Sequence, residues 1–507
     1  MMIDRILTVG GFTLLSRVTG FLRDIMLAAI LGAGPVADAF FVALRLPNHF
    51  RAIFGEGAFN AAFVPAYARI RETNGHQPSQ LFADRIFTLL LFVQLVLLAA
   101  ALAFMPAVIG VLAPGFNSDP SRFAMATELT RITFPYLLLI SLVTLYSGIL
   151  NALGRFATPA AAPILLNLSI MMTLALAAFF PTAGHAAAWG VLIAGVLEVI
   201  LVAGDAWKRD ALPKLRWPTL DFEMKGFLKR FGPATVGSAE TQIALFADTI
   251  IASFLVAGSL SALYYADRLN QLPIGVIGIA AGTVLLPEMA RRIAAGDEVG
   301  ARHSQNRAVE LTLLLAVPCM VAFMIVPELI MRALFGRGAF TAANAQAAGA
   351  TLAAYSIGLL PFVLMRSATV TFLSRGDTIT PVKALFFAVV VNVALKIALM
   401  GSHAQVGLAL GTAAGAWVNL TLLIWFAARA NLITVETALW KSMARTAFAG
   451  AALAIALLLC RRPVEAFFIG WRFSQEAMLC TLGAIGVAIY GVALFTPIGW
   501  RVLVVRR

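Results

Sequence analysis

Apolar runs long enough to cross a membrane dominate this sequence of 507 residues. An α-helix needs about 20 residues to span a hydrocarbon core, and runs of that length recur from the first turns of the chain almost to its end. Only 12% of the residues are charged, whereas a water-soluble domain carries about 25%. No polar stretch between the runs is long enough to fold alone. The pattern therefore predicts an all-α integral membrane protein without a soluble domain.

Proline, glycine and charge clusters divide the apolar runs into about fourteen transmembrane helices. We place these helices at 5–31, 36–69, 84–112, 123–154, 158–180, 185–206, 224–257, 261–292, 304–335, 343–374, 379–400, 404–429, 440–460 and 475–498. The first helix carries Arg17, Arg23 and Asp24. That is more charge than a cleavable signal peptide tolerates, so we expect this helix to remain in the mature protein.

Lysine and arginine residues gather on the loops that share a side with both termini, above all in the long polar link from Lys208 to Arg230. The main exceptions are Arg122, Arg332, Arg337, Arg461, Arg462 and Arg472. By the positive-inside rule this bias predicts a multi-pass protein of the bacterial inner membrane with both termini in the cytoplasm. The net charge of +13 comes from single residues at helix ends, so we expect no nucleic-acid partner.

Landmarks in the first half of the chain recur in the second half at a nearly constant spacing. They are the prolines of 45–65 and 272–287, the tripeptides at 114–116 and 338–340, and Arg155, Thr158 and Asn167, which match Arg375, Thr380 and Asn392. A repeat of six helices is even, so both copies enter the membrane from the same side and a pseudo-two-fold axis runs along the membrane normal. We therefore predict an N-terminal lobe at 1–215, a C-terminal lobe at 216–435 and two extra helices at 436–507.

Two six-helix lobes permit alternating access, in which one lobe rocks against the other. Helix breakers at Gly32, Gly34 and Pro35 in an outer link, and at Pro47, Gly55 and Gly57 in the second helix, are the expected bending points. The extra helices at 436–507 either form an apolar groove for a lipid tail or only thicken one lobe.

Charged residues inside the membrane concentrate in the first two helices and in the eighth. A charge at mid-bilayer costs at least about 2.5 to 3.5 kcal/mol, so each one must face protein or water. The arginines expected to bind an anionic substrate in a central cavity are Arg17, Arg23, Arg51 and Arg268. The carboxylates expected to pair with them or to gate the cavity are Asp24, Asp38, Glu56 and Asp267. The alternative is that these groups are satisfied ion pairs that only position helices.

Arg17 and Arg23 are six residues apart, so an ideal helix splays them by about 120° and only a wide cavity takes both. Gly20 between them offers a bending point. With that bend, we expect Arg23, Arg51 and Arg268 to converge from three helices on one cavity. Arginine suits phosphate oxygens better than lysine does, so a phosphorylated substrate is indicated.

Lys396 lies near the outer end of the eleventh helix, on the same face as Asn392. One hypothesis pairs Lys396 with Asp248, so that a tethered ammonium occupies a place where Asp248 and Asn392 could otherwise hold a monovalent cation. Transport would then be insensitive to sodium. The alternative is that Lys396 snorkels to the interface.

Catalytic chemistry finds little support in the residues. His49, His76, His185, His303 and His403 are scattered over different loops and helix ends, and no carboxylate cluster suits a metal. We expect outer-loop His185 and His403 to be solvated, and the scattered Cys319, Cys460 and Cys480 to be small buried apolar residues. No catalytic residue, metal or cofactor is predicted, and no phosphate-binding loop supports direct ATP hydrolysis.

Four segments closely resemble one family. They are the motifs at 16–24 (SerArgValThrGlyPheLeuArgAsp), 38–48 (AspAlaPhePheValAlaLeuArgLeuProAsn), 55–65 (GlyGluGlyAlaPheAsnAlaAlaPheValPro) and 264–269 (TyrTyrAlaAspArgLeu). They resemble the MurJ (MviN) lipid II flippase family of the MOP exporter superfamily, and the resemblance covers essentially the whole chain. It implies that essential cavity charges fall on Arg17, Arg23, Asp38, Arg51, Glu56 and Arg268. The chain departs from the family pattern at Ala52, Asn270 and Gln271, to which the resemblance assigns no role.

The resemblance implies translocation of lipid II, an undecaprenyl-pyrophosphate-linked peptidoglycan precursor, from the cytoplasmic to the periplasmic leaflet. Lipid II and membrane lipids are the expected partners, and cell-wall synthesis enzymes are candidate partners. Three alternatives remain: an exporter of another lipid-linked oligosaccharide or drug in the same superfamily, a membrane enzyme acting on the same lipid, and a scaffold for cell-wall enzymes.

Overall fold

The computed structural model describes residues 2–51 and 58–495, and within them every regular element is a helix. The chain divides into two compact units, Met1–Ser261 and Ala262–Arg507. The first unit contains α1 (Met2–Leu31), α2 (Pro35–Arg51), α3 (Ala58–Asn74), α4 (His76–Ala103), α5 (Met105–Leu112), the 3₁₀ helix η2 (Pro114–Ser118), α6 (Pro120–Thr133), α7 (Tyr136–Ala152), α8 (Ala157–Ala175), the 3₁₀ helix η3 (Ala177–Phe179), α9 (Ala183–Trp207) and α10 (Phe222–Ser253).

The second unit begins within α11 (Ser259–Pro273), which passes through a π-helical turn, η4 (Ile274–Gly278), into α12 (Ile279–Ala294). It continues with α13 (Glu298–Ile325), α14 (Pro327–Phe335), α15 (Ala342–Ile357), α16 (Leu359–Leu373), α17 (Ile379–Arg429), α18 (Thr437–Phe468) and α19 (Ser474–Phe495).

Within residues 2–51 and 58–495, the predicted helical ranges fall on helices of the structure, but their ends differ. The range 123–154 is broken at Phe134 and Pro135 into α6 and α7, because proline cannot continue the backbone hydrogen bonds. The ranges 379–400 and 404–429 both lie in α17, which kinks at Ala404, where φ is 46°. Among the described residues, nine helical segments are long and apolar enough to cross a membrane. The count of fourteen transmembrane helices stays a prediction.

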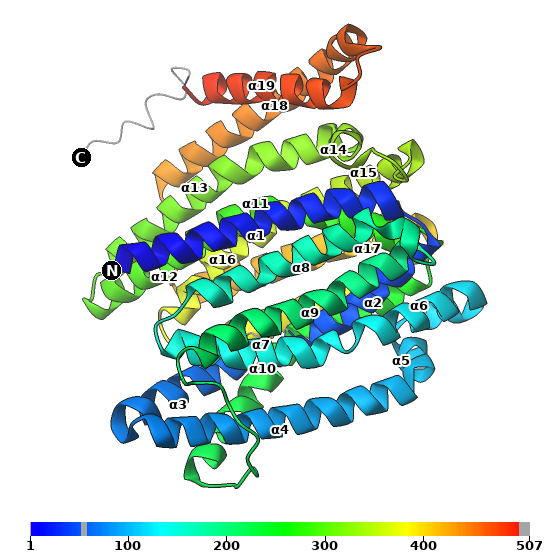
Figure 1. Ribbon diagram of the computed structural model, residues 1–507. Helices are drawn as coiled ribbons and strands as arrows, with labels where there is room; N and C mark the ends of the chain where they lie inside the picture. The colour runs from blue at the N-terminus through cyan, green and yellow to red at the C-terminus, as the bar shows by residue number, and fades with distance from the viewer. Residues whose placement is uncertain (1, 52–57, 496–507) are drawn as a thin grey trace. The chain divides into compact units, whose positions relative to one another are not determined.

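In the first unit, α8 packs against α9 and α1, and α2 packs against α6 (Figure 1). Small residues permit these close approaches. A Cβ atom added to Gly190 of α9 would lie 2.8 Å from Ile170 Cα of α8, and one added to Gly195 would lie 2.7 Å from the Tyr136 ring of α7. These two glycines therefore set the spacing between α9 and its neighbours.

In the second unit, α18 packs against α19 and α13 (Figure 1), and the two halves of α17 fold back on each other. Gly411 and Gly415 in the second half face Lys396 and Asn392 in the first half. An added Cβ at either glycine would lie within 2.7 Å of those side chains. The buried polar residues of α17 therefore depend on glycine at these two positions.

The boundary between the compact units differs from the predicted lobe boundary near residue 215. Helix α10 packs against α3 and η2, so it joins the first unit. The lobe assignment rests on the sequence repeat. A repeat shows which helices of the two halves correspond, but it does not show which helices contact each other in a given conformation. The lobes at 1–215 and 216–435 therefore stay a prediction.

Candidate functional site

Asp38, predicted to gate the cavity, lies fully buried in the first turn of α2. Its carboxylate accepts hydrogen bonds from the backbone amides of Gly258 and Ser261, each at 2.8 Å, and from the Ser261 hydroxyl. The Arg122 guanidinium donates to the same carboxylate at 3.0 Å. The free backbone amides at the start of a helix need acceptors, and the helix dipole favours a negative charge there. Asp38 supplies both to the first turn of α11.

Arg122 joins this group from the start of α6 and is itself buried. Its guanidinium carbon lies 4.1 Å from the centre of the Phe116 ring, and its Nη1 donates to the Leu255 carbonyl. We call Asp38, Arg122, Gly258 and Ser261 the Asp38 knot. The knot connects α2 and α6 to the link between α10 and α11.

Two glycines bring the backbones at the knot into direct contact. The amide of Gly115 donates to Ser253 Oγ at 3.0 Å, and a Cβ on Gly115 would lie 2.4 Å from the Ser253 carbonyl. Gly258 has φ of +91°, and an added Cβ would lie 3.2 Å from the Ala33 carbonyl oxygen. Any larger side chain at Gly115 must separate η2 from the end of α10.

Arg23 and Asp24 form a second buried cluster, between α1 and α8. Both Nε and Nη2 of Arg23 donate to Asp24 Oδ1, at 3.1 and 2.7 Å, and its Nη1 donates to Asn167 Oδ1 at 3.0 Å. The Asn167 amide in turn donates to the Ser16 carbonyl and to Thr19 Oγ1. We call Arg23, Asp24 and Asn167 the Arg23 cluster. Its geometry is that of a satisfied ion pair within α1 that is joined to α8 through Asn167, as the alternative interpretation of the sequence expected.

Arg17 is exposed on α1 while Arg23 is buried, as their splay on one helix requires. An added Cβ on Gly20 would lie 3.4 Å from the Asn167 amide nitrogen, so Gly20 makes room for that side chain. The Arg51 side chain and Glu56 lie outside the described residues. Their predicted roles, and the convergence of Arg23, Arg51 and Arg268, stay predictions.

Arg45, a further charged residue of α2, donates to Thr249 Oγ1 of α10 at 3.0 Å. This contact joins α2 to α10, whereas the Asp38 knot joins α2 to the link after α10. Asp248, beside Thr249, is half-buried. Both contacts belong to the first compact unit.

Arg268 and Asp267 lie half-buried on α11. Arg268 donates to the Tyr264 hydroxyl at 3.1 Å, and its guanidinium carbon lies 5.0 Å from the centre of that ring. Gln271, a departure from the family pattern, donates to Asp267. An amide at position 271 therefore acts as a neutral donor to the neighbouring carboxylate.

Lys396 is only 1% exposed, so the snorkelling interpretation is wrong. The side chain packs inside the α17 hairpin, where the absence of a side chain at Gly411 leaves room for it. Asn392 Oδ1, on the same face, is buried without a hydrogen-bond donor among the described residues. The proposed pairing of Lys396 with Asp248 stays a prediction.

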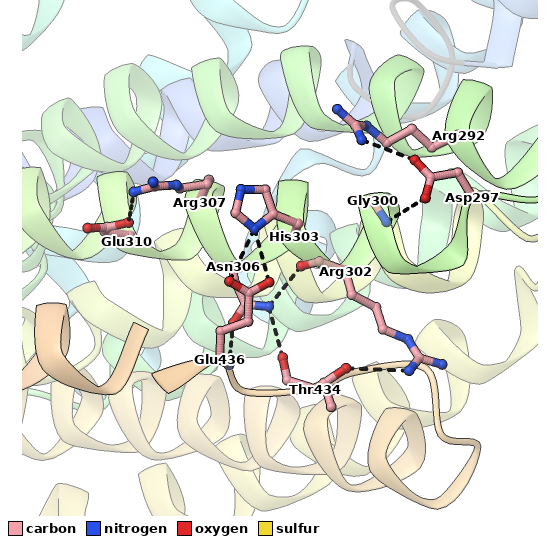
Figure 2. A network of polar contacts seen from close by, with 10 residues as sticks. All are labelled: Arg292, Asp297, Gly300, Arg302, His303, Asn306, Arg307, Glu310, Thr434 and Glu436. Carbon is pink, nitrogen blue, oxygen red and sulfur yellow. Dashed lines mark hydrogen bonds and ion pairs between the residues drawn. The ribbon is translucent and has the colours of Figure 1, made fainter. Parts of the chain in front are cut away.

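A polar network that the sequence did not predict ties the start of α13 to the link between α17 and α18 (Figure 2). Asn306 donates to the Thr434 carbonyl at 2.8 Å and accepts from the Glu436 amide. Arg302 donates to the Asn431 carbonyl at 2.7 Å, and His303 lies 3.1 Å from the Glu436 carboxylate. The network fixes the first turn of α18 to α13.

His185 is buried, which contradicts the expectation that it is solvated. Its Nδ1 lies 2.8 Å from Thr182 Oγ1, and its Nε2 lies 3.1 Å from Glu128. His403 is exposed, as expected. Of the cysteines, Cys480 is exposed and the other two are half-buried, so the expectation of buried cysteines is wrong.

The arrangement of helices matches solved membrane transporters. A structure described as "Lipid II flippase MurJ, inward closed conformation" superposes with a TM-score of 0.82 at 24% identity, covering 98% of this chain and 99% of that chain. An inward-facing multidrug resistance MATE family transporter superposes with a TM-score of 0.68 at 15% identity, covering 82% and 95% of the two chains. This chain therefore shares the fold of these two solved structures.

Sequence comparison narrows the class to one family. A family model described as "Lipid II flippase MurJ" matches residues 27–476. The probable lipid II flippase MurJ of Rhizobium meliloti (strain 1021) is 38% identical over 516 residues, which span 100% of this chain and 96% of the relative. The lipid II flippase MurJ of Burkholderia cenocepacia is 35% identical and covers 82% of each chain. This chain belongs to the lipid II flippase MurJ family.

Proposed function

We propose that this protein is a lipid II flippase of the inner membrane, with both termini in the cytoplasm. It moves the lipid-linked precursor from the cytoplasmic to the periplasmic leaflet by alternating access and carries out no chemical conversion. The family match over residues 27–476 is the observation that carries the proposal. The intramembrane arginines support it, because a pyrophosphate inside the bilayer needs cationic partners.

The Asp38 knot is proposed as the gate that closes the periplasmic end of the transport path. Under the predicted orientation, the start of α2, the start of α6 and the link between α10 and α11 all lie at that end. The repeat assigns α2 and α6 to one lobe and α10 and α11 to the other, so the knot would hold the lobes together there. Rocking of the lobes then requires the three hydrogen bonds from Gly258 and Ser261 to Asp38 to break, whereas the ion pair with Arg122 lies within one lobe.

The substrate's pyrophosphate is proposed to bind Arg17, Arg23, Arg51 and Arg268, with Asp24, Asp38, Glu56 and Asp267 as charge partners or gating groups. For Arg23, binding requires the guanidinium to exchange Asp24 or Asn167 for phosphate oxygens. A satisfied arginine of this kind is presented to substrate only when α1 and α8 shift or the phosphate displaces the carboxylate.

The polyprenyl tail is proposed to lie on α18 and α19. A groove of about 510 Å³ runs over Phe448, Ala452, Ile455, Leu459 and Ile489, and its lining is almost entirely apolar. Phe448, Ile455 and Leu459 are all more than half exposed. The polar network of Figure 2 would hold this groove in place by fixing α18 to α13.

A leaflet-translocation assay with the purified protein in vesicles tests the function. Lipid II labelled on its head group should move to the opposite leaflet, and an unlabelled lipid-linked oligosaccharide of another structure should not compete. Failure to move lipid II, together with translocation of that oligosaccharide when it carries the label instead, would identify an exporter of another substrate in the same superfamily.

The tethered-cation hypothesis is tested by a double-mutant cycle on Asp248→Asn and Lys396→Met. Coupled losses of thermal stability and transport without sodium dependence are expected if the two groups pair. Additive effects, or a sodium requirement in the wild type, would reject the tethered-cation hypothesis. The proposal that the protein transports lipid II does not depend on this result.

A further inference from the structure

A polar cavity of about 680 Å³ lies in the first compact unit where α7 ends, α8 begins and α9 ends. Arg155 and Arg209 contribute two positive charges to its lining, and Asp205 contributes the one negative charge. Thr8 and Thr158 add hydroxyl groups. We call this space the basic cavity.

Asp205 is already engaged by groups of the cavity itself. It accepts a hydrogen bond from Thr158 Oγ1 at 2.7 Å and lies 3.8 Å from Arg209 Nε. The Arg155 side chain makes no hydrogen bond or ion pair with any residue that the structure describes. The basic cavity therefore holds positive charge that its own carboxylate does not neutralise.

The equivalent place in the second half of the repeat is neutralised internally. Arg375, the counterpart of Arg155, is paired with Glu298 and donates to the Thr371 carbonyl at 2.8 Å. Asp377 accepts from the amides of Ile379 and Thr380, each at 3.0 Å. The hydrogen bond from the Thr380 side chain, with those amides, lowers the pKa of the Asp377 carboxyl below its usual range.

Neither carboxylate has a counterpart in the lining of the basic cavity, where Asp205 is the acidic residue. The segment from Arg155 to Pro159 is two residues shorter than the segment from Arg375 to Pro381, and it contains no counterpart of Asp377. The first turn of α8 consequently has no side-chain cap. Its free amides add to the positive potential of the two arginines.

Trp207 places the basic cavity at the level of lipid head groups. It is the last residue of α9, two positions before Arg209, and it is 70% exposed. Exposed tryptophan at a helix end is typical of the membrane interface. A basic cavity between transmembrane helices at that depth suits a lipid phosphate.

We propose that the basic cavity binds the phosphate of an anionic membrane phospholipid. Arg155 binds the phosphate oxygens, and Arg209 adds charge from the end of α9. The ligand is a resident lipid and is distinct from the transported substrate. The orientation given in the proposed function would place this lipid in the cytoplasmic leaflet. The binding of the lipid does not depend on that orientation.

Thermal unfolding of the purified full-length protein in detergent tests the proposal without any transport step. Phosphatidylglycerol should raise the unfolding midpoint, and phosphatidylethanolamine should not. The double variant Arg155→Gln, Arg209→Gln should need about tenfold more phosphatidylglycerol for the same shift. Restoration of the response by lysine at both positions would show that charge, and not a folding defect, was removed.

Lys208→Gln is the matched control, because Lys208 is exposed on the same helix end but does not line the basic cavity. Its response to phosphatidylglycerol should equal that of the wild type. An equal loss in this control, or no response in the wild type, would overturn the proposal. An equal shift with inorganic phosphate at the same phosphate concentration would also overturn it, since the cavity would then be a site for free phosphate.

Two measurements separate this inference from the proposed function. Lipid II translocation is measured in vesicles that lack anionic phospholipid, and phosphatidylglycerol binding is measured by thermal unfolding in detergent. Continued binding of phosphatidylglycerol by a protein that does not move lipid II would reject only the function. Translocation without any phosphatidylglycerol binding would reject only the lipid site.

Discussion

The Asp38 knot and the Arg23 cluster both bury an arginine beside a carboxylate, but they connect different parts of the sequence. The Arg23 cluster joins α1 to α8, both within residues 1–215. The Asp38 knot joins α2 and α6 to residues 258–261, beyond the predicted lobe boundary. Under rocking-lobe transport the first contact can persist through the cycle, whereas the second must break and re-form. Under the proposed gate, similar chemistry would serve as a permanent connection in one place and as a gate in the other.

Loss of the Asp38 carboxylate should have the largest effect. Asp38→Ala leaves Arg122 buried and uncompensated, and removal of one partner from such a pair costs about 3 to 5 kcal/mol. Lipid II translocation should fall at least about tenfold because the gate no longer closes, and the thermal unfolding midpoint should drop. The pair Asp38→Leu, Arg122→Leu should recover stability but not translocation. Recovery of both stability and translocation would show that the Asp38 knot, like the Arg23 cluster, is a purely structural contact.

Arg23 gives the next largest effect, and its variants decide between the two interpretations of the Arg23 cluster. Arg23→Ala should abolish translocation and also destabilise the protein by about 3 kcal/mol, since Asp24 and Asn167 lose their partner. In the double variant Arg23→Leu, Asp24→Leu, stability should return while translocation stays absent. Normal translocation in that variant would show that Arg23 never contacts substrate.

A single methyl group at Gly258 should perturb the Asp38 knot without removing a charge. Gly258→Ala forces a left-handed backbone conformation, which costs about 1 to 2 kcal/mol, and crowds the Ala33 carbonyl. We expect translocation to fall several-fold, with increased labelling of a cysteine introduced at Ser261 by a membrane-impermeant reagent. Gly204→Ala is the control, because no atom would lie within 4 Å of the added Cβ. Equal labelling in the two variants would argue against a gate.

The smallest effects are expected for the two outer histidines. His403→Ala should leave translocation and stability unchanged, because His403 is exposed. His185→Ala should translocate lipid II at a near wild-type rate but unfold at a lower temperature, since His185 is buried between Thr182 and Glu128. A large loss of translocation in either variant would indicate an acid-base role for that histidine. Neither the Asp38 knot nor the Arg23 cluster contains a histidine.

The sequence predicted the helices because membrane spans follow from local hydropathy, and it identified Asp38 and Arg23 because charge is rare inside a bilayer. It could not identify Arg122 as the partner of Asp38, since that contact depends on how α6 packs against α2. Gly115 was visible in a repeat landmark, but its reason, the 2.4 Å approach to Ser253, exists only in three dimensions. The sequence left snorkelling open as the alternative for Lys396 for the same reason: the burial of Lys396 depends on glycines in the other half of α17.

The separation of the Asp38 partners along the chain dictates an order of assembly during synthesis. Arg122 lies 84 residues after Asp38, whereas Gly258 and Ser261 lie 220 and 223 residues after it. A nascent chain must therefore accommodate Asp38 in the membrane for a long interval before the α11 amides leave the ribosome. Arg122 reaches the bilayer first, so we expect the ion pair to shelter the carboxylate until the eighth predicted helix is inserted. Arg122 would thus be the first partner of Asp38 during biogenesis, and Gly258 and Ser261 would add the other three contacts later.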